Sequence, residues 1–493
     1  MPKILHKFSI KNLVAPYIIV NFILLAGQAL YIFTRYKYIN SVIPLWLTKP
    51  WGDMQLADKT GIYYLPAIAL ALTIFGLVLI LISRKYFIRY FSKTVFAFVT
   101  FSNIMIFYSI FRIILVASVP FDHLINPHVL NLAIPFLTAF LLAYFFVPVF
   151  IDYAKENNLV TNPSIHAHPA MILSQPSARG GGLVYAGIFL IVSLIFTGFR
   201  QDFVGLYLSI IMISLLSIVD DFQNTHVNSH FKLLENPVLR LLLLFVSVIP
   251  VILSGLKITF ITNPLDKVGN VLFLDSFKLN IAGSDVSIIS VIITLVWIVW
   301  LMNVLSWSNG IDGQFSGILG IASLIVAFLA LRFAPLSDVQ ARVAIMSAIS
   351  AGIAFGFIKY TWHPSQIMWG FGAMCAGLVL SVLSILIQGK LVTSVLIILI
   401  PFLDAVVTVV RRLIQGKNPF KGDRGHLHHL LLERGWNAKK IALFYWFTTA
   451  IFGIIGLVTA EKYTVQVVLF LGILVAFFII LLNLLSLKAK QEE

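Results

Sequence analysis

Two adjacent carboxylates are the first residues in this sequence whose types and spacing could do chemistry. Asp220 and Asp221 stand in "SIVDDFQNTH" (217–226), where an apolar stretch ends. Ionisable side chains at membrane depth are costly and are therefore often functional. Such a pair could bind a divalent cation or accept a proton, and a nearby cation or base would help to keep both groups ionised. Asp220 and Asp221 are thus candidate catalytic residues; the alternative is a solvated helix end.

A second group of titratable residues lies in "GDRGHLHHLLLERG" (422–435). This segment contains His426, His428 and His429 close to Asp423 and Arg424. Clustered histidines in a basic segment suit a phosphate or pyrophosphate group. They could also form a transition-metal site, but no Cys is nearby and the basic side chains oppose a cation. We therefore favour phosphate binding, with an ordinary basic loop as the remaining interpretation.

Two glycine-containing segments could also contribute to a site. "PSARGGGLVYAG" (176–187) places Arg179 and three glycines before an apolar stretch. Glycines at a helix start let backbone N–H groups approach an anion; a flexible hinge is the alternative. "NVLSWSNGIDGQFSG" (303–317) follows an uncharged apolar run, and its candidate substrate-binding residues are Asn303, Asn309, Asp312 and Gly313.

Two further features give weaker indications of function in the sequence alone. Asp404 in "IPFLDAVVTVVRR" lies inside an apolar run, and it could either pair with a basic group or line the site. His226 and His230 are spaced i, i+4, which we interpret as chance.

The elements that must position these residues are membrane-spanning helices. The chain has 493 residues, of which 59% are hydrophobic and 11% charged, whereas soluble domains carry about 25% charged residues. Apolar runs of about 20 residues predict helices that span a bilayer. We expect an all-α polytopic protein with about fourteen spans, near 17–35, 65–83, 94–118, 129–151, 182–198, 203–219, 238–254, 288–306, 313–333, 341–358, 370–387, 392–410, 441–459 and 465–485.

The distribution of charge predicts the orientation in a bacterial-type cytoplasmic membrane. Lys and Arg number 35 against 20 for Asp and Glu, a formal charge of +15. With both termini in the cytoplasm, an alternating path puts the basic segments 1–12, 84–93 and 411–440 on the cytoplasmic side. The chemically interesting polar segments then share that face; they are 152–181, 220–237, 303–312, 359–371 and 411–440.

The polar chemistry begins after residue 150. We therefore expect residues 1–128 to form an appended block of about three helices, and residues 129–493 to form the functional domain with about eleven. Strand-like alternation in 255–287 predicts a small hairpin on the opposite side. No internal repeat is present, so an inverted-repeat transporter is not supported. The single Cys375 excludes an internal disulfide.

Taken in order, "PSARGGG", "VDDF", "NVLSWSNGIDG" and "PFLDAVVTVVRRLIQGKNPFKGDRGHLHH" resemble the polyprenyl-phosphate N-acetylhexosamine-1-phosphate transferases, glycosyl transferase family 4. This family includes bacterial undecaprenyl-phosphate GlcNAc-1-phosphate transferases and phospho-N-acetylmuramoyl-pentapeptide transferase. The likeness covers about residues 129–485. The "HxHH" loop is most similar to the branch that uses UDP-N-acetylglucosamine-like donors.

The resemblance implies a reaction of cell-envelope polysaccharide or peptidoglycan synthesis. A polyprenyl phosphate, such as undecaprenyl phosphate, attacks the β-phosphorus of a UDP-N-acetyl sugar and releases UMP, with Mg²⁺ offsetting the diphosphate charge. The expected partners are these two substrates and the lipid bilayer, without nucleic acid, and a homodimer is common among similar proteins.

The resemblance also implies residue roles. Asp220 and Asp221 would act at the carrier phosphate, and Asp312 would contact the uridine. Pro237 and Arg240 match a "P-x-x-R" of the family. His426, His428 and His429 would hold the sugar-phosphate end, and Arg424 is a further candidate substrate-binding residue.

Several positions depart from the family pattern. In N-x-x-N-x-x-D-G-x-D-G, Ser306 replaces the second Asn and Asn309 the first Asp. Phe371 stands where the family has a Mg²⁺-binding Asp, and Mg²⁺ requires hard oxygen ligands. Either Asp220 and Asp221 hold Mg²⁺ in a different way, or the chain binds the lipid carrier or nucleotide sugar without turnover.

Overall fold

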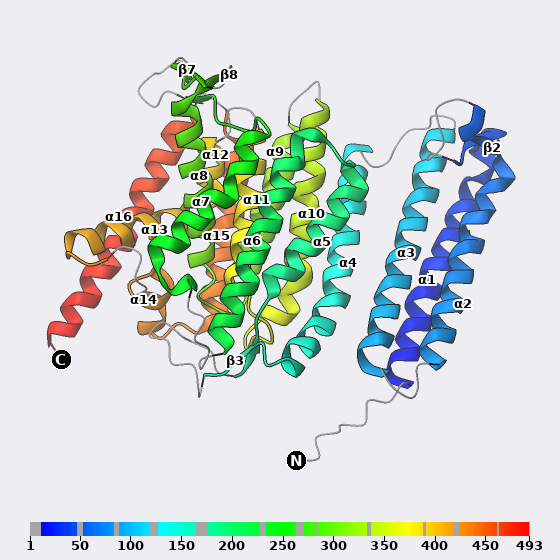
Figure 1. Cartoon of the computed structure of the whole chain (residues 1–493), viewed down its shortest axis with the longest axis horizontal. Coiled ribbons are helices and arrows are strands. Elements are labelled where there is room, and N and C mark those ends of the chain that lie inside the picture. The colour runs from blue at the N-terminus through cyan, green and yellow to red at the C-terminus, as the bar shows by residue number, and fades with distance from the viewer. Residues whose placement is uncertain are drawn as a thin grey trace, which may run out of the picture. The chain divides into compact units, whose positions relative to one another are not determined.

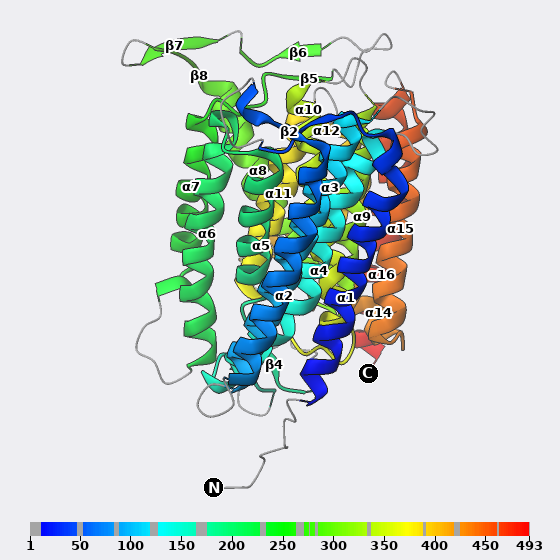
Figure 2. The ribbon, with the colours of Figure 1, turned by 90° about the vertical axis from the view of Figure 1, so that its right-hand side faces the viewer.

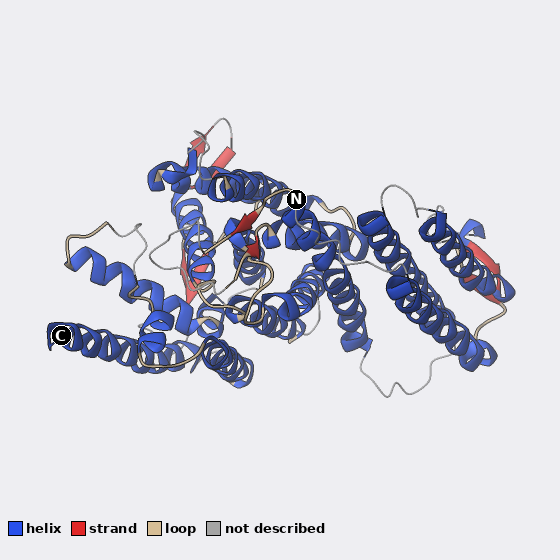
Figure 3. Cartoon of the chain, turned by 90° about the horizontal axis from the view of Figure 1, so that it is seen from below, coloured by secondary structure: helices blue, strands red, loops and turns tan. Residues whose placement is uncertain are grey.

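The computed structural model describes residues 11–46, 53–82, 88–118, 127–163, 175–226, 233–262, 271–275, 277–281, 284–332, 337–387, 391–418, 424–460 and 463–492. These residues form mostly α-helices (Figures 1 and 3). The chain divides into two compact units, Met1–Ile134 and Pro135–Glu493, which we call unit 1 and unit 2.

Unit 1 contains the helices α1 (Lys11–Arg35), α2 (Tyr64–Ile82) and α3 (Ile88–Ala117) and the antiparallel pair β1 (Val42–Pro44) and β2 (Leu56–Asp58). Buried polar side chains join the three helices. Asn103 Nδ2 on α3 donates to Asn21 Oδ1 on α1 at 2.7 Å and to Thr73 Oγ1 on α2 at 2.8 Å. Each interhelical bond of this kind contributes about 0.6–2 kcal/mol within a bilayer, so the network fixes how the three helices pack.

Unit 2 is a helical bundle whose most buried members are α9, α10 and α11. Helix α4 (Pro127–Glu156) begins in unit 1 and continues into unit 2. The other helices are α5 (Gly181–Thr197), α6 (Gln201–Thr225), α7 (Pro237–Leu253), α8 (Ile288–Trp307), α9 (Gln314–Leu331), α10 (Asp338–Thr361), α11 (Ala373–Leu386), α12 (Leu391–Ile397), α13 (Leu399–Ile414), α14 (Leu427–Glu433), α15 (Ala438–Val458) and α16 (Thr464–Glu492). A short 3₁₀ helix, η6 (Gly370–Gly372), precedes α11.

The predicted all-α membrane architecture is confirmed, but the count of fourteen spans is not. Within the described residues, ten helices are long and apolar enough to cross a membrane, or eleven with one bent pair. That pair is α12 and α13, which meet at 87°, so the span predicted near 392–410 is not a straight helix. Three further apolar helices are shorter, with 10–17 residues, and lie where three of the spans were predicted: Gly181–Thr197, Pro237–Leu253 and Gly370–Leu386.

The strands of unit 2 form small antiparallel pairs at its two ends (Figure 2). At one end β3 (Val160–Thr161) pairs with β4 (Ser177–Ala178). At the other end β5 (Phe260–Thr262) pairs with β6 (Val271–Phe273), and β7 (Lys278–Ile281) pairs with β8 (Ser284–Ser287). The single hairpin expected in 255–287 is therefore two hairpins.

Candidate functional site

The carboxylate pair lies in the last turns of α6 beside two guanidinium groups. Asp220 and Asp221 are both buried. Arg179 Nη1 is 3.5 Å from Asp221 Oδ1 and 3.8 Å from Asp220 Oδ2, and Arg240 Nη1 is 3.9 Å from Asp220 Oδ1. Asn224 Nδ2 donates to Asp220 Oδ2 at 2.9 Å. The two acids therefore share Arg179 as a neighbouring positive charge.

Arg179 is positioned by a short stretch of extended chain. It directly follows β4, and its Nε donates to Thr161 Oγ1 on β3 at 2.8 Å. Ala178 forms a parallel bridge to Ile367. Contacts with Thr161 and with the segment around Ile367 thus position Arg179, and they direct its guanidinium group towards α6.

The glycines after Arg179 do not form the anion-binding helix start that we considered. The N–H of Gly181 donates to Met368 O at 3.0 Å, and that of Gly182 donates to Trp369 O at 3.1 Å. A Cβ built on Gly182 would overlap the backbone of Gly372. These N–H groups already have acceptors, so the glycines serve the close packing of α5 against residues 368–372.

This packing brings η6 to the carboxylate pair. Gly370 has φ +60°, and a Cβ built on it would overlap Asp221 Oδ1. The ring of Phe371 is 3% exposed. Arg240 Cζ lies 4.6 Å from the centroid of that ring, which is a cation–π distance. Phe371 therefore supports the guanidinium that approaches Asp220.

The polar loop between α8 and α9 carries a carboxylate–imidazole pair. Asp312 Oδ2 is 2.7 Å from His363 Nδ1 and accepts the Ser365 N–H at 3.2 Å. The sequence reasoning did not select His363. The feature of the sequence that could have indicated His363 is its position in the polar segment 359–371, which connects two helices at one face of the bundle.

The other candidate residues in this loop and at the end of α8 form hydrogen bonds mainly to nearby backbone groups. Asn303 Nδ2 donates to Val299 O within α8 at 2.8 Å. The N–H of Asn309 donates to Ser306 O at 3.2 Å in the turn that follows. Gly313 has φ +77° directly before α9, a left-handed conformation that glycine adopts without a steric penalty. These residues shape the loop around Asp312.

The histidine segment is attached to the bundle through Asp404. His426 Nδ1 lies 3.0 Å from Asp404 Oδ2, and the Leu427 N–H donates to Asp404 Oδ1 at 2.7 Å. Asp404 thus contacts His426, which is itself a candidate site residue, so both interpretations of Asp404 stay predictions. The bend between α12 and α13 precedes this residue by a few positions.

His428 is the most enclosed of the three histidines. A Cβ built on Gly310 would overlap its Nε2, so the ring packs against the α8–α9 loop. Its ring is stacked with that of His426 at 5.6 Å and lies 4.4 Å from that of His429. Burial, followed by the charges of these two neighbours, lowers the pKa of His428 well below its ordinary value. His428 is therefore neutral near pH 7.

These clusters are connected by contacts at one end of unit 2. Residues 362–372 reach Asp312 through His363 and Asp221 through Gly370. Residues 308–313 reach His428 through Gly310. This is the end that carries β3 and α14 in Figure 1 and faces the viewer in Figure 3. Arg424 is exposed, while His230 and Asp423 lie outside the described residues.

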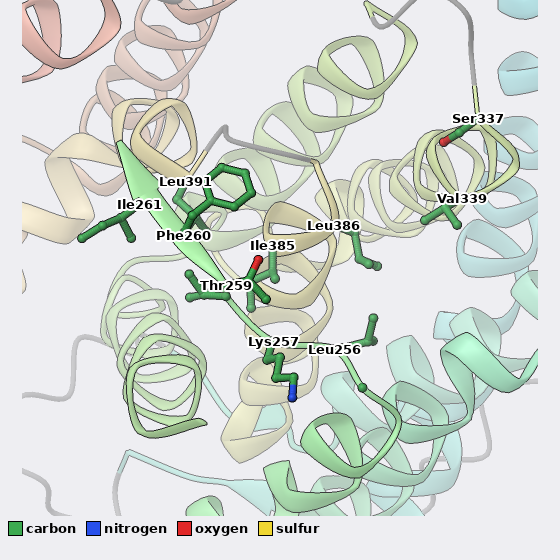
Figure 4. A pocket seen from close by; sticks show the side chains of 12 residues that line it. Leu256, Lys257, Thr259, Phe260, Ile261, Ser337, Val339, Ile385, Leu386 and Leu391 are labelled. Carbon is green, nitrogen blue, oxygen red and sulfur yellow. The ribbon is translucent and has the colours of Figure 1, made fainter. Parts of the chain in front are cut away.

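A hollow of about 450 Å³ lies at the opposite end of the bundle (Figure 4). Its lining includes Lys257, Phe260 and Leu391, together with Ser337 and Val339 at the start of α10. The far end of α10 leads into His363. The hollow contains none of the predicted site residues and is separate from the candidate site.

Near the carboxylate pair the described residues offer a resident Mg²⁺ two carboxylates, both of which already face a guanidinium group. Among the described residues, no group of three or more His, Cys, Asp or Glu side chains could hold a metal ion. Asp220 and Asp221 supply carboxylate oxygens, but Arg179 lies 3.5–3.8 Å from both. The adjoining Phe371 ring has no oxygen to offer, and Mg²⁺ requires near-octahedral oxygen coordination.

Comparison with known proteins finds similarity to one family of membrane transferases. Residues 203–388 match the profile of glycosyl transferase family 4. This matched range contains Asp220, Asp221, Asp312 and Phe371 and ends before the histidine segment.

Individual relatives cover different shares of the chain. The decaprenyl-phosphate N-acetylglucosaminephosphotransferase of Mycolicibacterium smegmatis is 26% identical over 37% of this chain and 51% of that protein. The probable undecaprenyl-phosphate N-acetylglucosaminyl 1-phosphate transferase of Bacillus subtilis is 23% identical over 72% and 92%. The phospho-N-acetylmuramoyl-pentapeptide-transferase of Orientia tsutsugamushi is 24% identical over 66% and 91%. The chain spans about half the length of the first of these relatives.

Proposed function

We propose that this chain, whose residues 203–388 belong to glycosyl transferase family 4, transfers a phospho-N-acetylhexosamine to a polyprenyl phosphate. A phosphate oxygen of the carrier attacks the β-phosphorus of a UDP-N-acetyl sugar. The bond between that phosphorus and the bridging oxygen breaks, and UMP leaves with the bridging oxygen. The product is a polyprenyl-diphosphate sugar for cell-envelope synthesis.

The observation that carries this proposal is the pair of buried carboxylates beside two guanidinium groups at the end of α6. Phosphoryl transfer depends mainly on positioning and on the stabilisation of negative charge. Arg179 and Arg240 would attract the phosphate groups, and the Asp220–Asp221 pair would accept a proton from the attacking phosphate or orient it. The names of the relatives support the same substrate classes.

The remaining clusters would hold the donor. We assign Asp312, with His363 oriented by it, to the nucleotide end, and the segment containing Arg424, His426, His428 and His429 to the sugar-phosphate end. The charge distribution of the sequence supports a cytoplasmic location for this face. Mg²⁺, which the resemblance implies, has no part in this proposal because both carboxylates already face a guanidinium group.

The test is UMP release by the purified full-length chain supplied with UDP-GlcNAc and undecaprenyl phosphate. We expect Asp221→Asn to reduce the rate by about 100-fold or more, the scale of general acid–base catalysis. The matched control is Asp202→Asn at the opposite end of the same helix, where the side chain is half exposed beside Arg200. The control should retain the original rate.

Two results would contradict the proposal. One is the absence of UMP from a folded, monodisperse preparation, including when UDP-GalNAc replaces UDP-GlcNAc. The other is an equal loss of rate in Asp221→Asn and Asp202→Asn, since this would indicate a general structural effect.

A further inference from the structure

The guanidinium groups of Arg179 and Arg240 lie beside the carboxylate pair. Arg179 Nη1 is within 3.8 Å of both acids, and Arg240 Nη1 is 3.9 Å from Asp220. The Arg179 side chain is 16% exposed, whereas that of Arg240 is 38% exposed. Arg179 is thus a largely enclosed counter-charge, and Arg240 can be reached by an incoming anion.

Phe371 determines where Arg240 lies. Its buried ring is 4.6 Å from the guanidinium carbon, and such a contact contributes about 0.5–2 kcal/mol. The neighbouring Gly370 leaves no space between η6 and Asp221. An aromatic ring at this position can support a flat guanidinium but cannot coordinate a metal ion, so the two kinds of charge balance exclude each other here.

We propose that Arg179 and Arg240, and not a resident divalent cation, balance the charge of the Asp220–Asp221 pair, and that Arg240, supported by Phe371, receives the phosphate group of the substrate. The identity of that phosphate as part of a polyprenyl phosphate or nucleotide sugar rests on the proposed function. The charge balance itself does not, because it follows from the contacts among these five residues.

The first test measures Mn²⁺ binding to the full-length protein in detergent, without substrate, from the electron paramagnetic resonance signal of free Mn²⁺. We expect the original chain to leave this signal unchanged. Phe371→Asp should bind Mn²⁺ at least about tenfold more tightly, because a third carboxylate adds a hard oxygen ligand. The control Phe371→Leu removes the ring without adding oxygen and should resemble the original chain.

The Mn²⁺ result has a clear contrary outcome. Saturable uptake of Mn²⁺ by the original chain that disappears in Asp221→Asn would overturn the proposal. This comparison does not require Phe371→Asp to fold.

The second test uses inorganic pyrophosphate in excess EDTA as the probe of the phosphate-binding arrangement. We expect pyrophosphate to raise the thermal unfolding midpoint of the original chain, by ligand linkage. Arg240→Gln should lose this rise. Lys257→Gln, a basic residue at the opposite end, should keep it. A rise that requires Mg²⁺, or one that persists in Arg240→Gln, would overturn the proposal.

Neither measurement depends on turnover. If UMP is not released but both binding results are as expected, the proposed function fails and the charge balance stands. If UMP is released and the original chain binds Mn²⁺ through Asp221, the function stands and this inference fails.

Discussion

The pair formed by Asp312 and His363 shows how one carboxylate can orient a neighbouring functional group. Asp312 Oδ2 lies 2.7 Å from His363 Nδ1 and also accepts the Ser365 N–H. When Nδ1 carries the proton, Nε2 is left to face a ligand. The His363 side chain is 34% exposed and that of Asp312 is 14% exposed, so the imidazole can meet a substrate while the carboxylate holds it.

At this scale we predict that Asp312→Asn and His363→Ala each lower kcat/KM for UMP release by about 10- to 100-fold, the value of a charge-assisted hydrogen bond of roughly 1.5–3 kcal/mol. Because the two residues act as one unit, the double variant should be little worse than either single variant. Additive losses would show that Asp312 and His363 act independently. His226→Ala, at the C-terminal end of α6, is the control.

At the scale of elements, the packing of α5 against residues 368–372 positions η6 beside Asp221. Hydrogen bonds from Gly181 and Gly182 to residues 368 and 369 join the two backbones. Their close approach sets the distance from Phe371 and Gly370 to α6. The positions of Asp220 and Asp221 relative to η6 thus depend on a contact between two backbones.

We predict that Gly182→Ala lowers the free energy of unfolding by about 1–3 kcal/mol, because the added methyl group overlaps the rigid backbone of Gly372. UMP release should fall with it, since η6 must shift relative to Asp221. Gly187→Ala on the same helix is the control, because its Cβ would meet nothing within 4 Å. Thermal unfolding in detergent measures both variants. Equal stability of the two would show that the close approach is not required.

For the whole molecule, buried His428 links folding to pH. It joins α14 to the α8–α9 loop through Gly310, more than 100 residues earlier in the chain. In the unfolded chain this side chain titrates near its ordinary pKa of about 6.5, whereas burial lowers its pKa in the folded chain. Below about pH 6.5 the unfolded state therefore binds more protons than the folded state.

We predict that acidification from about pH 7 towards pH 5 destabilises the protein and that His428→Gln removes part of this pH dependence. The sign follows from linkage: stability rises with pH wherever the unfolded state binds more protons. Above about pH 6.5 the contribution of His428 is constant. Thermal unfolding midpoints between pH 5 and 8 measure the effect, with His226→Gln as the control. An identical slope for His428→Gln and the original chain would contradict the prediction.

The membrane architecture was predictable from the sequence because it rests on local properties, whereas the site residues stay predictions. Apolar runs identify helices through their length alone, and charged or amide residues at the ends of such runs indicate a polar face. The count of fourteen spans stays a prediction. The structure also contains apolar helices of 10–17 residues and an 87° bend between α12 and α13. Such features depend on packing against neighbouring helices, which the length of an apolar run does not describe.

The sequence by itself determined that Asp220, Asp221, Asp312 and the histidine segment belong at the ends of apolar helices, because hydrophobic periodicity and charge require no knowledge of distant contacts. Only the tertiary structure decided their partners. Arg179 reaches Asp221 across 42 positions, Asp312 reaches His363 across 51 and His426 reaches Asp404 across 22. Such pairings arise from helix packing, so the support of Arg240 by Phe371 could be recognised only once α7 and η6 were seen side by side.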